Sequence, residues 1–545
     1  MRPKILSRAR AAAACLAFAA AAQPAPVVHA PAGITRGVDA GGVHVFKGLP
    51  YALAPVGERR WRPPEPLPPW QGERNAADFG APCVQPKGRP GSIYSEDLPP
   101  MSEDCLSLNI WAPARARRAP VLVWIHGGAL VSGWSGAGLY DGTAMARRGI
   151  IVVSINYRLG VLGYLAHPGL SAESAAGVSG NYGLLDQIAA LRWVRDNIAA
   201  FGGDPSKVTI AGESAGALSV MYLLASPPAR GLFAGAIAES AYMISTPELR
   251  AARFGEVPAE TIGTALAAKL GASDVAALRA MAAGPLTDAA ARAGYGPFGT
   301  IDGNVLPRQL VDVFDRGEQA KVPVLTGFNS GEIRSLRFLA PPVPADAAVY
   351  AAQIHERYGD LADTFLALYP ASDLADSVLR APRDALYGWT SERLVRKQTA
   401  LGVPSFLYFF DHGYPAADAA GLHAFHASEL PYVFGTADRA PPLWPSVPAD
   451  PTEAHLSAAM TGYWVAFARD GRPDARGEPE WHPYGAERAY MAFADAPRPG
   501  THLLPGMYEL EEQLVCRRRA DGGIPWNWNV GLVSPPLPAE VPGCR

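Results

Sequence analysis

The chain has 545 residues, of which 49% are hydrophobic and 18% are charged, and its formal net charge is -3. This composition is typical of a large globular protein and excludes a fibrous or intrinsically disordered chain. The nearly balanced charge provides no basic surface for nucleic acid or anionic lipid, so we expect a small-molecule partner.

The first thirty residues have the layout of a secretory signal peptide. Four basic residues precede an apolar run over residues 11–22: Arg2, Lys4, Arg8 and Arg10. A run this short does not span a bilayer as a helix. Small-residue cleavage motifs end at Ala22 and Ala30, so residues 1–22 are the predicted signal peptide, with cleavage as late as residue 30. We therefore expect an exported protein, periplasmic or secreted, without stable membrane insertion.

Four cysteines remain after this segment, and an even number suits an oxidising compartment. They are Cys83, Cys105, Cys516 and Cys544. Proximity in the sequence favours pairing of Cys83 with Cys105 and of Cys516 with Cys544, each closing a local loop worth roughly 2–4 kcal/mol. No C-x-x-C motif or histidine cluster accompanies them, so we expect disulfides and no metal site.

Short apolar runs bounded by Gly and Pro recur along the chain. Runs of this kind, rich in Val and Ile, predict buried strands of a mostly parallel sheet. The predicted strands lie within residues 120–128, 149–160, 207–216, 235–240, 322–331 and 404–412. Ala-rich helical patterns over residues 232–309 and 345–399 predict insertions that cap the sheet. The fold class is therefore α/β, with helices on both faces of the sheet, in one domain over residues 23–545 whose disulfide-closed C-terminal extension begins at about residue 516.

A serine between two glycines ends the third predicted strand, in VTIAGESAGA (208–217). An amphipathic helical pattern over residues 184–205 leads into this strand. A tight strand-to-helix turn strains its central residue, and only small neighbours let the two arms approach. Such a turn presents the hydroxyl of Ser214 and leaves the N–H of Ala215 free to face a developing negative charge. The sequence therefore predicts a nucleophile elbow at Ser214.

A serine nucleophile needs a base, an orienting acid and donors for the oxyanion. The stretch WIHGGAL (124–130) follows an earlier strand, and its Gly127, Gly128 and Ala129 can present backbone N–H groups. Together with Ala215 these residues are the predicted oxyanion hole. The spacing leaves open whether Gly127 or Ala129 acts beside Gly128.

In folds of this type the acid and the base follow the nucleophile in chain order. Glu332 comes just after the strand pattern VPVLT, where the acid is expected, and Asp302 is the alternative. An Asp directly before Gly is more often a turn-former, which favours Glu332. Among the downstream histidines, His423 and His426 lie in a loop after a predicted strand, and the pattern alone does not separate them.

Taken together, these motifs resemble the type-B carboxylesterases, an α/β-hydrolase family that includes bacterial esterases and the cholinesterases. The resemblance covers nearly all of the mature chain and rests on ordered motifs such as FKGLPYALAPVGERRWRPPEP, SEDCLSLNIWAP, WIHGGAL, INYRLGVLGYL, GESAGA, GFNSGE and FHASELPYVFG. It implies an α/β-hydrolase fold that needs no metal or organic cofactor. It also implies that His426, which stands before Ala-Ser-Glu-Leu, is the base, and that Cys105 pairs with Cys83.

The resemblance further implies that Glu213 lies near the histidine and that Ser240 is a buried polar residue behind the triad. The chain also departs from the family pattern. Family members often have Gln in the position of Glu239, and cholinesterases have a choline-binding Trp where this chain has Ser95. The loss of that cation–π platform argues against a choline ester as substrate.

The sequence thus predicts a secreted or periplasmic serine carboxylesterase, monomeric, that hydrolyses a small ester through a Ser-His-Glu triad and an acyl-enzyme. A lactone, amide or carbamate hydrolase would use the same residues. A non-catalytic binding module is the other alternative, although such relatives typically lose the nucleophile or the histidine. Arg334 and Arg337, close to Glu332, raise the hypothesis that the ester carries a carboxylate.

Overall fold

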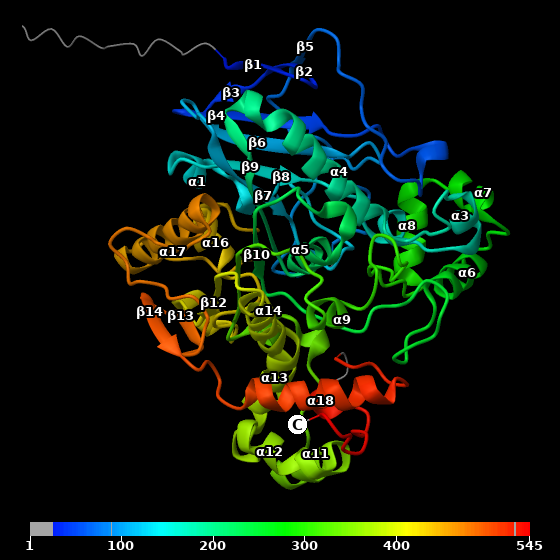
Figure 1. Cartoon of the computed structure of the whole chain (residues 1–545), viewed down its shortest axis with the longest axis vertical. Coiled ribbons are helices and arrows are strands. Elements are labelled where there is room, and N and C mark those ends of the chain that lie inside the picture. The colour runs from blue at the N-terminus through cyan, green and yellow to red at the C-terminus, as the bar shows by residue number, and fades with distance from the viewer. Residues whose placement is uncertain (1–24, 89, 528–529, 545) are drawn as a thin grey trace, which may run out of the picture.

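A long twisted sheet forms the centre of the computed structural model, which describes residues 25–88, 90–527 and 530–544; the predicted signal peptide, residues 1–22, lies outside them. In the described chain the sheet has eleven strands, in the order β14-β13-β12-β11-β10-β9-β7-β8-β6-β4-β3 (Figure 1). The strands are β3 (Val38–Asp39), β4 (Val43–Pro50), β6 (Ser107–Pro113), β7 (Ala119–Ile125), β8 (Ile151–Ile155), β9 (Gly203–Glu213), β10 (Gly235–Glu239), β11 (Val324–Asn329), β12 (Ser405–Phe410), β13 (Ala489–Phe493) and β14 (Pro497–Thr501). A separate three-stranded sheet has the order β1 (Val27–Ala30), β2 (Gly33–Arg36) and β5 (Glu73–Asn75).

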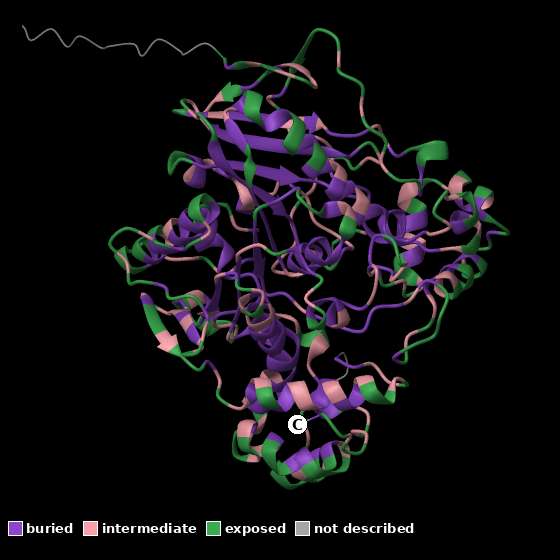
Figure 2. Cartoon of the chain, in the orientation of Figure 1, coloured by how far each residue is buried: buried purple, intermediate pink, exposed green. Residues whose placement is uncertain are grey.

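The strands from β8 across to β13 pair in parallel, and antiparallel strands lie only toward the two edges. This arrangement confirms the predicted α/β class and a mostly parallel sheet. Every residue of β7, β8 and β10 is buried, as Figure 2 shows for the centre of the molecule. Strands buried on both faces have no polar side to alternate with, which is why they appear in the sequence as continuous apolar runs.

Helices cover both faces of this sheet. The larger α-helices are α4 (Tyr182–Asn197), α5 (Ala215–Ala225), α6 (Ala259–Lys269), α8 (Ala283–Arg292), α11 (Ala347–Tyr358), α13 (Leu374–Arg383), α14 (Trp389–Ala400), α17 (Pro451–Asp470) and α18 (Met507–Asp521). The shorter ones are α1 (Thr143–Arg147), α2 (Gly160–Tyr164), α3 (Pro168–Glu173), α7 (Val275–Ala280), α9 (Leu310–Asp315), α10 (Glu332–Ser335), α12 (Ala362–Leu368), α15 (Pro415–Ala419) and α16 (Leu430–Phe434).

Alternate residues of β7 show how the two faces are filled. Val123 and Ile125 belong to the apolar cluster that contains Leu191 of α4. Leu122 and Trp124 belong to a second cluster, which contains α17. Because side chains alternate between the faces of a strand, these two clusters lie on opposite sides of the sheet.

The predicted insertions are helical. Helices α6, α7 and α8 lie to one side of the sheet, and α11 and α12 lie beside α18 at the far end of the molecule (Figure 1). Both predicted disulfides are present, Cys83–Cys105 and Cys516–Cys544. Within the described residues, no helix combines the length and the apolar character needed to cross a membrane.

Candidate active site

Ser214 occupies a sharp turn between β9 and α5. Strand β9 ends at Glu213 and α5 begins at Ala215, so the serine is the single residue between them. Its backbone angles are φ 56° and ψ −121°, a conformation that residues with a side chain rarely adopt. The first N–H groups of a helix have no intrahelical acceptor, so α5 directs unpaired donors, including that of Ala215, beside the serine.

The glycines around Ser214 are required by space. A Cβ atom on Gly216 would lie 2.1 Å from the carbonyl oxygen of Ile125 in β7, and one on Gly212 would lie 2.6 Å from the carbonyl carbon of Gly216. Both distances are far below van der Waals contact, so any side chain would force the helix away from the sheet. The glycines that flank Ser214 in the sequence are therefore explained by the close approach of α5 to the sheet, as the sequence predicted.

The loop after β7 lies against this turn. A Cβ on Gly127 would lie 3.3 Å from Cβ of Ser214, and Gly128 and Ala129 have φ values of 103° and 55°. The carbonyl of Gly128 points into its own loop, where it accepts the N–H of Ser132 at 3.0 Å. Because a trans peptide places its N–H opposite its C=O, the N–H of Ala129 points away from that turn.

His126 fixes this loop, a role that the sequence analysis missed. Its Nδ1 donates to the carbonyl oxygen of Gly127 at 2.9 Å, and its ring stacks on Tyr157, whose hydroxyl donates to the carbonyl of His126 at 2.8 Å. Complete burial lowers the pKa of His126 to about 4, so the imidazole is neutral at physiological pH. The motif WIHGG contained the signal, but it did not show where the imidazole points.

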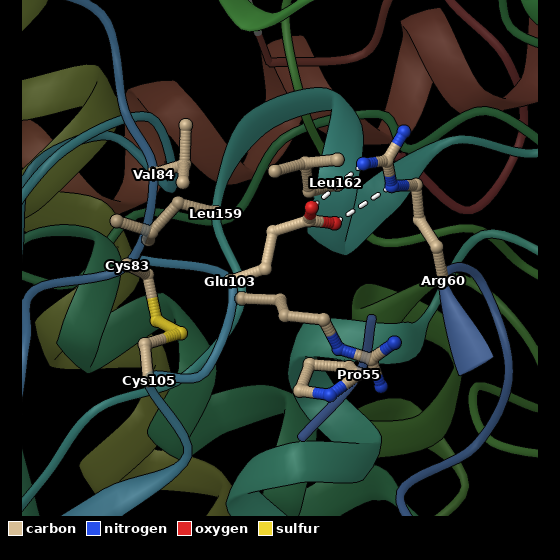
Figure 3. Close-up of a pocket in the computed structure, with 9 residues that line it drawn as sticks. Pro55, Arg60, Cys83, Val84, Glu103, Cys105, Leu159 and Leu162 are labelled. Carbon is tan, nitrogen blue, oxygen red and sulfur yellow. Dashed lines mark hydrogen bonds and ion pairs between the residues drawn. A yellow bond between two sulfur atoms is a disulfide. The ribbon is translucent and has the colours of Figure 1, made fainter. Parts of the chain in front are cut away.

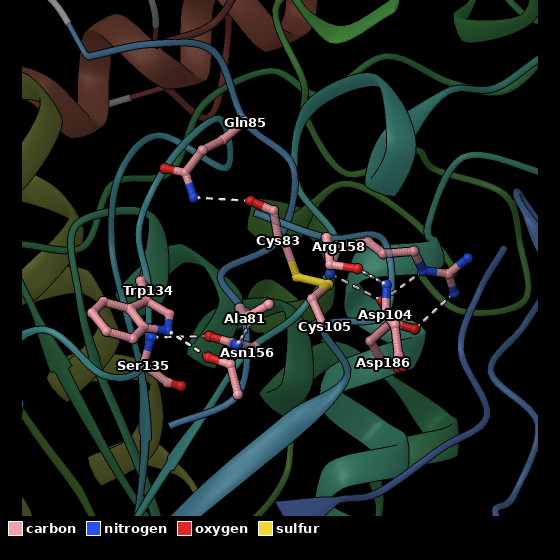
Figure 4. Close-up of a disulfide and its surroundings, with 12 residues drawn as sticks. Ala81, Cys83, Gln85, Asp104, Cys105, Trp134, Ser135, Asn156, Arg158 and Asp186 are labelled. Atoms are coloured by element: carbon pink, nitrogen blue, oxygen red, sulfur yellow. Dashed lines mark hydrogen bonds and ion pairs between the residues drawn. A yellow bond between two sulfur atoms is a disulfide. The ribbon is translucent and has the colours of Figure 1, made fainter. Parts of the chain in front are cut away.

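The first disulfide is tied to the same loop, as Figure 4 shows in part. The amide nitrogen of Gln85 donates to the carbonyl of Cys83 at 3.1 Å and to that of Gly133 at 2.9 Å. The N–H of Gly133 returns a bond to the Gln85 side chain at 2.9 Å. Covalent closure of the Cys83–Cys105 loop therefore restrains the segment that follows Gly127–Ala129.

Glu332 is completely buried at the start of α10, just after β11. Its Oε1 accepts the hydroxyl of Ser240 at 2.7 Å and the N–H of Asn329 at 2.9 Å, and its Oε2 contacts Nδ1 of His426. Three donors thus orient one carboxylate. Asp302 lies elsewhere and accepts the backbone N–H groups that follow it, as expected of a turn-former.

The two candidate histidines have different partners. His423 is partly exposed between Asp411 and Asp418, with contacts of 3.3 Å and 2.8 Å to their carboxylates. His426 is buried and reaches Glu332 through Nδ1, while its Nε2 lies 3.0 Å from Oε1 of Glu213. The structure therefore brings His426, and not His423, to Glu332 and to the residue that precedes Ser214.

Buried carboxylates control the charge of His426. Burial acts to lower the pKa of His426, but the charges of Glu213 and Glu332 outweigh it and raise that pKa to about 9. Burial also raises the pKa of Glu213, and the charge of Glu332 adds to the rise. The Nε2–Oε1 contact is not a hydrogen bond, since Glu213 Oε1 has no hydrogen-bond partner among the described residues. Nε2 thus keeps its hydrogen-bonding capacity for another group.

Two further buried glutamates, to which the sequence motifs assigned no role, lie near this site. Glu239 accepts Nε1–H of Trp464 at 2.9 Å, and Glu429 accepts the side-chain amide of Asn329. Burial raises the pKa of Glu239 to about 8, and burial with neighbouring carboxylates raises the pKa of Glu429 well above its usual value. The family pattern had indicated only that position 239 departs from Gln.

Aromatic rings surround the histidine. Tyr387 comes from a π-helical turn, Asp384–Gly388, and its ring centroid lies 5.5 Å from that of His426. The hydroxyl of Tyr94 donates to the carbonyl oxygen of His426 at 2.9 Å, and its ring packs edge-on against Trp444. A π-helical turn is often found at a functional site.

The arginines near Glu332 have partners on the protein. Arg334 forms an ion pair with Asp376 at 3.1 Å, and Nε of Arg337 donates to the carbonyl of Arg334 at 3.3 Å. The carboxylate of Asp376 also pairs with Arg380 at 3.8 Å. One carboxylate thus faces two guanidinium groups, and the Arg334 side chain is engaged with it while remaining 34% exposed.

Two cavities lie away from Ser214. One, of about 10 Å³, adjoins Cys83–Cys105 and the Arg60–Glu103 ion pair (Figure 3). Its volume suits a single water molecule and not an ester. The other, about 580 Å³, is lined partly by residues 112–118 and 199–205, at the opposite ends of β7 and β9 from the serine. Neither cavity contains a residue of the predicted triad.

Comparison with known proteins identifies the family. The sequence profile of the carboxylesterase family matches residues 24–507, so the match ends where α18 begins. The fumonisin B1 esterase of Sphingopyxis macrogoltabida is 38% identical over 488 residues, covering 86% of this chain and 86% of that protein. The para-nitrobenzyl esterase of Bacillus subtilis is 35% identical over 477 residues, covering 85% of this chain and 94% of that protein.

Comparison with solved structures identifies the same family. A structure of PNB esterase superposes with a TM-score of 0.76 at 32% identity, covering 89% of this chain and 99% of that one. This similarity confirms the predicted α/β-hydrolase fold. The structural match covers about as much of this chain as the matches to the sequence relatives do. The chain therefore belongs to the carboxylesterase family and is a carboxylic ester hydrolase.

Proposed function

We propose that the protein is an exported serine carboxylesterase in which Ser214, His426 and Glu332 form the catalytic triad. The observation that carries this proposal is the buried contact between Glu332 and Nδ1 of His426, set beside the strained turn at Ser214. Nδ1 carries the proton in this arrangement, so Nε2 is the atom that can act as a base. Family membership supports the ester as the substrate class.

The proposed reaction proceeds through an acyl-enzyme. Nε2 of His426 takes the proton of Ser214 while Oγ attacks the ester carbonyl, and Glu332 stabilises the resulting imidazolium without becoming protonated. His426 then gives this proton to the leaving alcohol. A water molecule activated by the same nitrogen hydrolyses the acyl-enzyme and restores the free serine.

The oxyanion is assigned to backbone donors. Ala215 provides the N–H at the start of α5, and Gly127, Gly128 and Ala129 provide those of the loop after β7. Donors fixed before the reaction stabilise the tetrahedral intermediate because they need no reorganisation, and each is worth roughly 10²–10³ in rate. The His126 contact to Gly127 and the Gln85 contact to Gly133 support the required rigidity of this loop.

The proposal also includes export of the protein from the cytoplasm. Two disulfides are the expected adaptation of a protein outside the cytoplasm, and the N-terminal sequence has the layout of a signal peptide. N-terminal sequencing of the protein recovered from the periplasm or the culture medium tests this part. A mature terminus near residue 23 is expected, and an intact Met1 in a cytoplasmic product would contradict it.

A burst assay tests the catalytic proposal. Purified protein is mixed with short- and medium-chain p-nitrophenyl esters, beside a Ser214→Ala variant. A burst equal to the enzyme concentration is expected for the wild type, and none for the variant. Para-nitrobenzyl esters and fumonisin B1 extend the panel, because relatives are named for them. A folded Ser214→Ala variant that kept its burst would exclude Ser214 as the nucleophile.

A further inference from the structure

Glu213 and Glu239 form a pair of buried carboxyl groups. Glu213 contacts His426, whereas the proposed reaction gives Glu239 no role. They are the last residues of β9 and β10, and they are register partners across these parallel strands. Register partners on adjacent strands point to the same face of a sheet. Both side chains are buried, so two acidic groups lie side by side at the strand ends that carry the nucleophile.

Glu239 also contacts the nucleophile turn directly. Its backbone carbonyl accepts the N–H of Ser214 at 2.9 Å. The next residue, Ser240, donates its hydroxyl to Glu332. One short segment at the end of β10 therefore touches the proposed nucleophile, lies beside Glu213 and orients the proposed acid.

The side chain of Glu239 has little to neutralise it. Its Oε1 accepts Nε1–H of Trp464 from α17, whereas its buried Oε2 has no hydrogen-bond partner among the described residues. The titratable groups that act on it electrostatically are Glu213 from β9, Glu429 at the start of α16 and Tyr408 from β12. Within the described chain no Lys, Arg or His forms an ion pair with Glu239. His426, the cationic partner of this cluster, pairs instead with Glu213 and Glu332.

Such surroundings favour a neutral carboxyl at low and neutral pH. Burial is the main cause that raises the pKa of Glu239 to about 8; the Trp464 donor opposes the rise and the charge of Glu213 contributes to it. His426 loses its proton over the same range. An ionising Glu239 therefore adds negative charge near His426 while that histidine is being deprotonated, and neighbouring anions favour the protonated imidazole.

We propose that Glu239 is a positioning residue that acts through Glu213 to set the pH at which His426 becomes available as the base. This inference rests on the proposed Ser214–His426–Glu332 triad. The carboxyl group of Glu239 can titrate, whereas an amide at the same position could not. The carboxyl at this position therefore gives this chain an additional control over the acid limb of its pH profile.

The test is the Glu239→Gln variant, which keeps an oxygen for Trp464 and carries no charge at any pH. Two rates are followed against pH: kcat/KM for a short-chain p-nitrophenyl ester, and inactivation by phenylmethanesulfonyl fluoride, which needs no natural substrate. The acid limb is expected to move to lower pH by roughly half a unit or more, which is about threefold in rate on the limb. Limbs that coincide with those of the wild type in both assays would overturn the proposal.

Two further variants separate a shift of the acid limb caused by Glu239 from a shift caused by changing any buried carboxyl group. Glu511→Gln changes another buried glutamate whose burial raises its pKa to about 8, but it lies in α18 beside Arg518, so no shift is expected. A shift of equal size in this control would overturn the proposal. Trp464→Phe removes the donor that lowers the pKa of Glu239, so that Glu239 stays neutral to higher pH and the limb moves in the same direction as in Glu239→Gln. A shift in the opposite direction would overturn the proposal even if Glu239→Gln did not fold.

The Ser214→Ala variant distinguishes failure of the proposed triad from failure of the role proposed for Glu239. If it keeps full activity, the proposed triad fails, and with it the basis of this inference. If Ser214→Ala is inactive while Glu239→Gln matches the wild type at every pH, the triad stands and only the role of Glu239 is lost.

Discussion

Nε2 of His426 lies 3.0 Å from Oε1 of Glu213, so the imidazole is held between two buried carboxyl groups. Glu213 directly precedes Ser214, and the same strand end therefore provides the proposed nucleophile and a negative charge for the base. Burial opposes protonation of His426, but these charges raise its pKa to about 9. A base must be neutral to accept a proton, so activity is expected to rise with pH through this pKa.

Replacing Glu213 by Gln tests that relationship. The charge of Glu213 is the larger of the two that raise the pKa of His426, so its removal lowers that pKa. The acid limb of kcat/KM, measured between roughly pH 5 and pH 10, is expected to move to lower pH by about one unit. An unchanged limb with a uniform loss of rate would mean that Glu213 supports the turn and not the charge of the histidine.

The second prediction concerns the space around the nucleophile turn. Gly216→Ala places a methyl group 2.1 Å from the carbonyl of Ile125, so the turn must distort. Loss of the burst and a destabilisation of about 1–3 kcal/mol are expected in chemical denaturation. Gly485→Ala is the matched control, because its Cβ would meet only the carbonyl of Pro483 at 3.8 Å. Its stability is expected to change by less than about 0.5 kcal/mol, and normal activity in Gly216→Ala would contradict the steric argument.

The two disulfides are expected to have different effects on activity. Removing either, by paired Cys→Ser substitutions, is expected to cost roughly 2–4 kcal/mol of stability. Only loss of Cys83–Cys105 loosens the loop that Gln85 ties to Gly133, so kcat is expected to fall on the order of tenfold. Loss of Cys516–Cys544, which lies outside the family match, is expected to leave kcat unchanged. Equal kcat values in the two double variants would remove the proposed link to the oxyanion loop.

The last prediction concerns charged substrates. The guanidinium of Arg334 is engaged in an ion pair with Asp376, which disfavours a further contact with an ester carboxylate. Arg334→Ala is expected to change kcat/KM for anionic and neutral esters by the same factor, within about twofold. A selective loss of more than about tenfold for the anionic ester would instead assign Arg334 to substrate recognition.

Several features were predictable because their causes are local. The turn at Ser214 depends on residues two positions away, and Gly212 and Gly216 show in the sequence the close approach that the structure contains. The buried parallel strands appear as apolar runs because both of their faces are covered. Both disulfides join cysteines that are near in sequence. Strands β3, β4, β6, β13 and β14, which lie toward the two edges of the sheet, were not predicted. Polar residues, Gly or Pro interrupt the apolar residues of β4, β6 and β14.

The sequence by itself determined the fold class, the family and the candidate triad residues, because a tight turn, an apolar run and a motif are properties of neighbouring residues. Only the tertiary structure decided which groups meet. The contact between Glu332 and His426 joins residues 94 positions apart, and the pairing of Glu213 with Glu239 depends on the register of two strands. Register and loop packing follow from the summed burial of the whole chain, and no local pattern encodes them. The charge of His426 was decided at that level, since it depends on which carboxylates the packing places beside it.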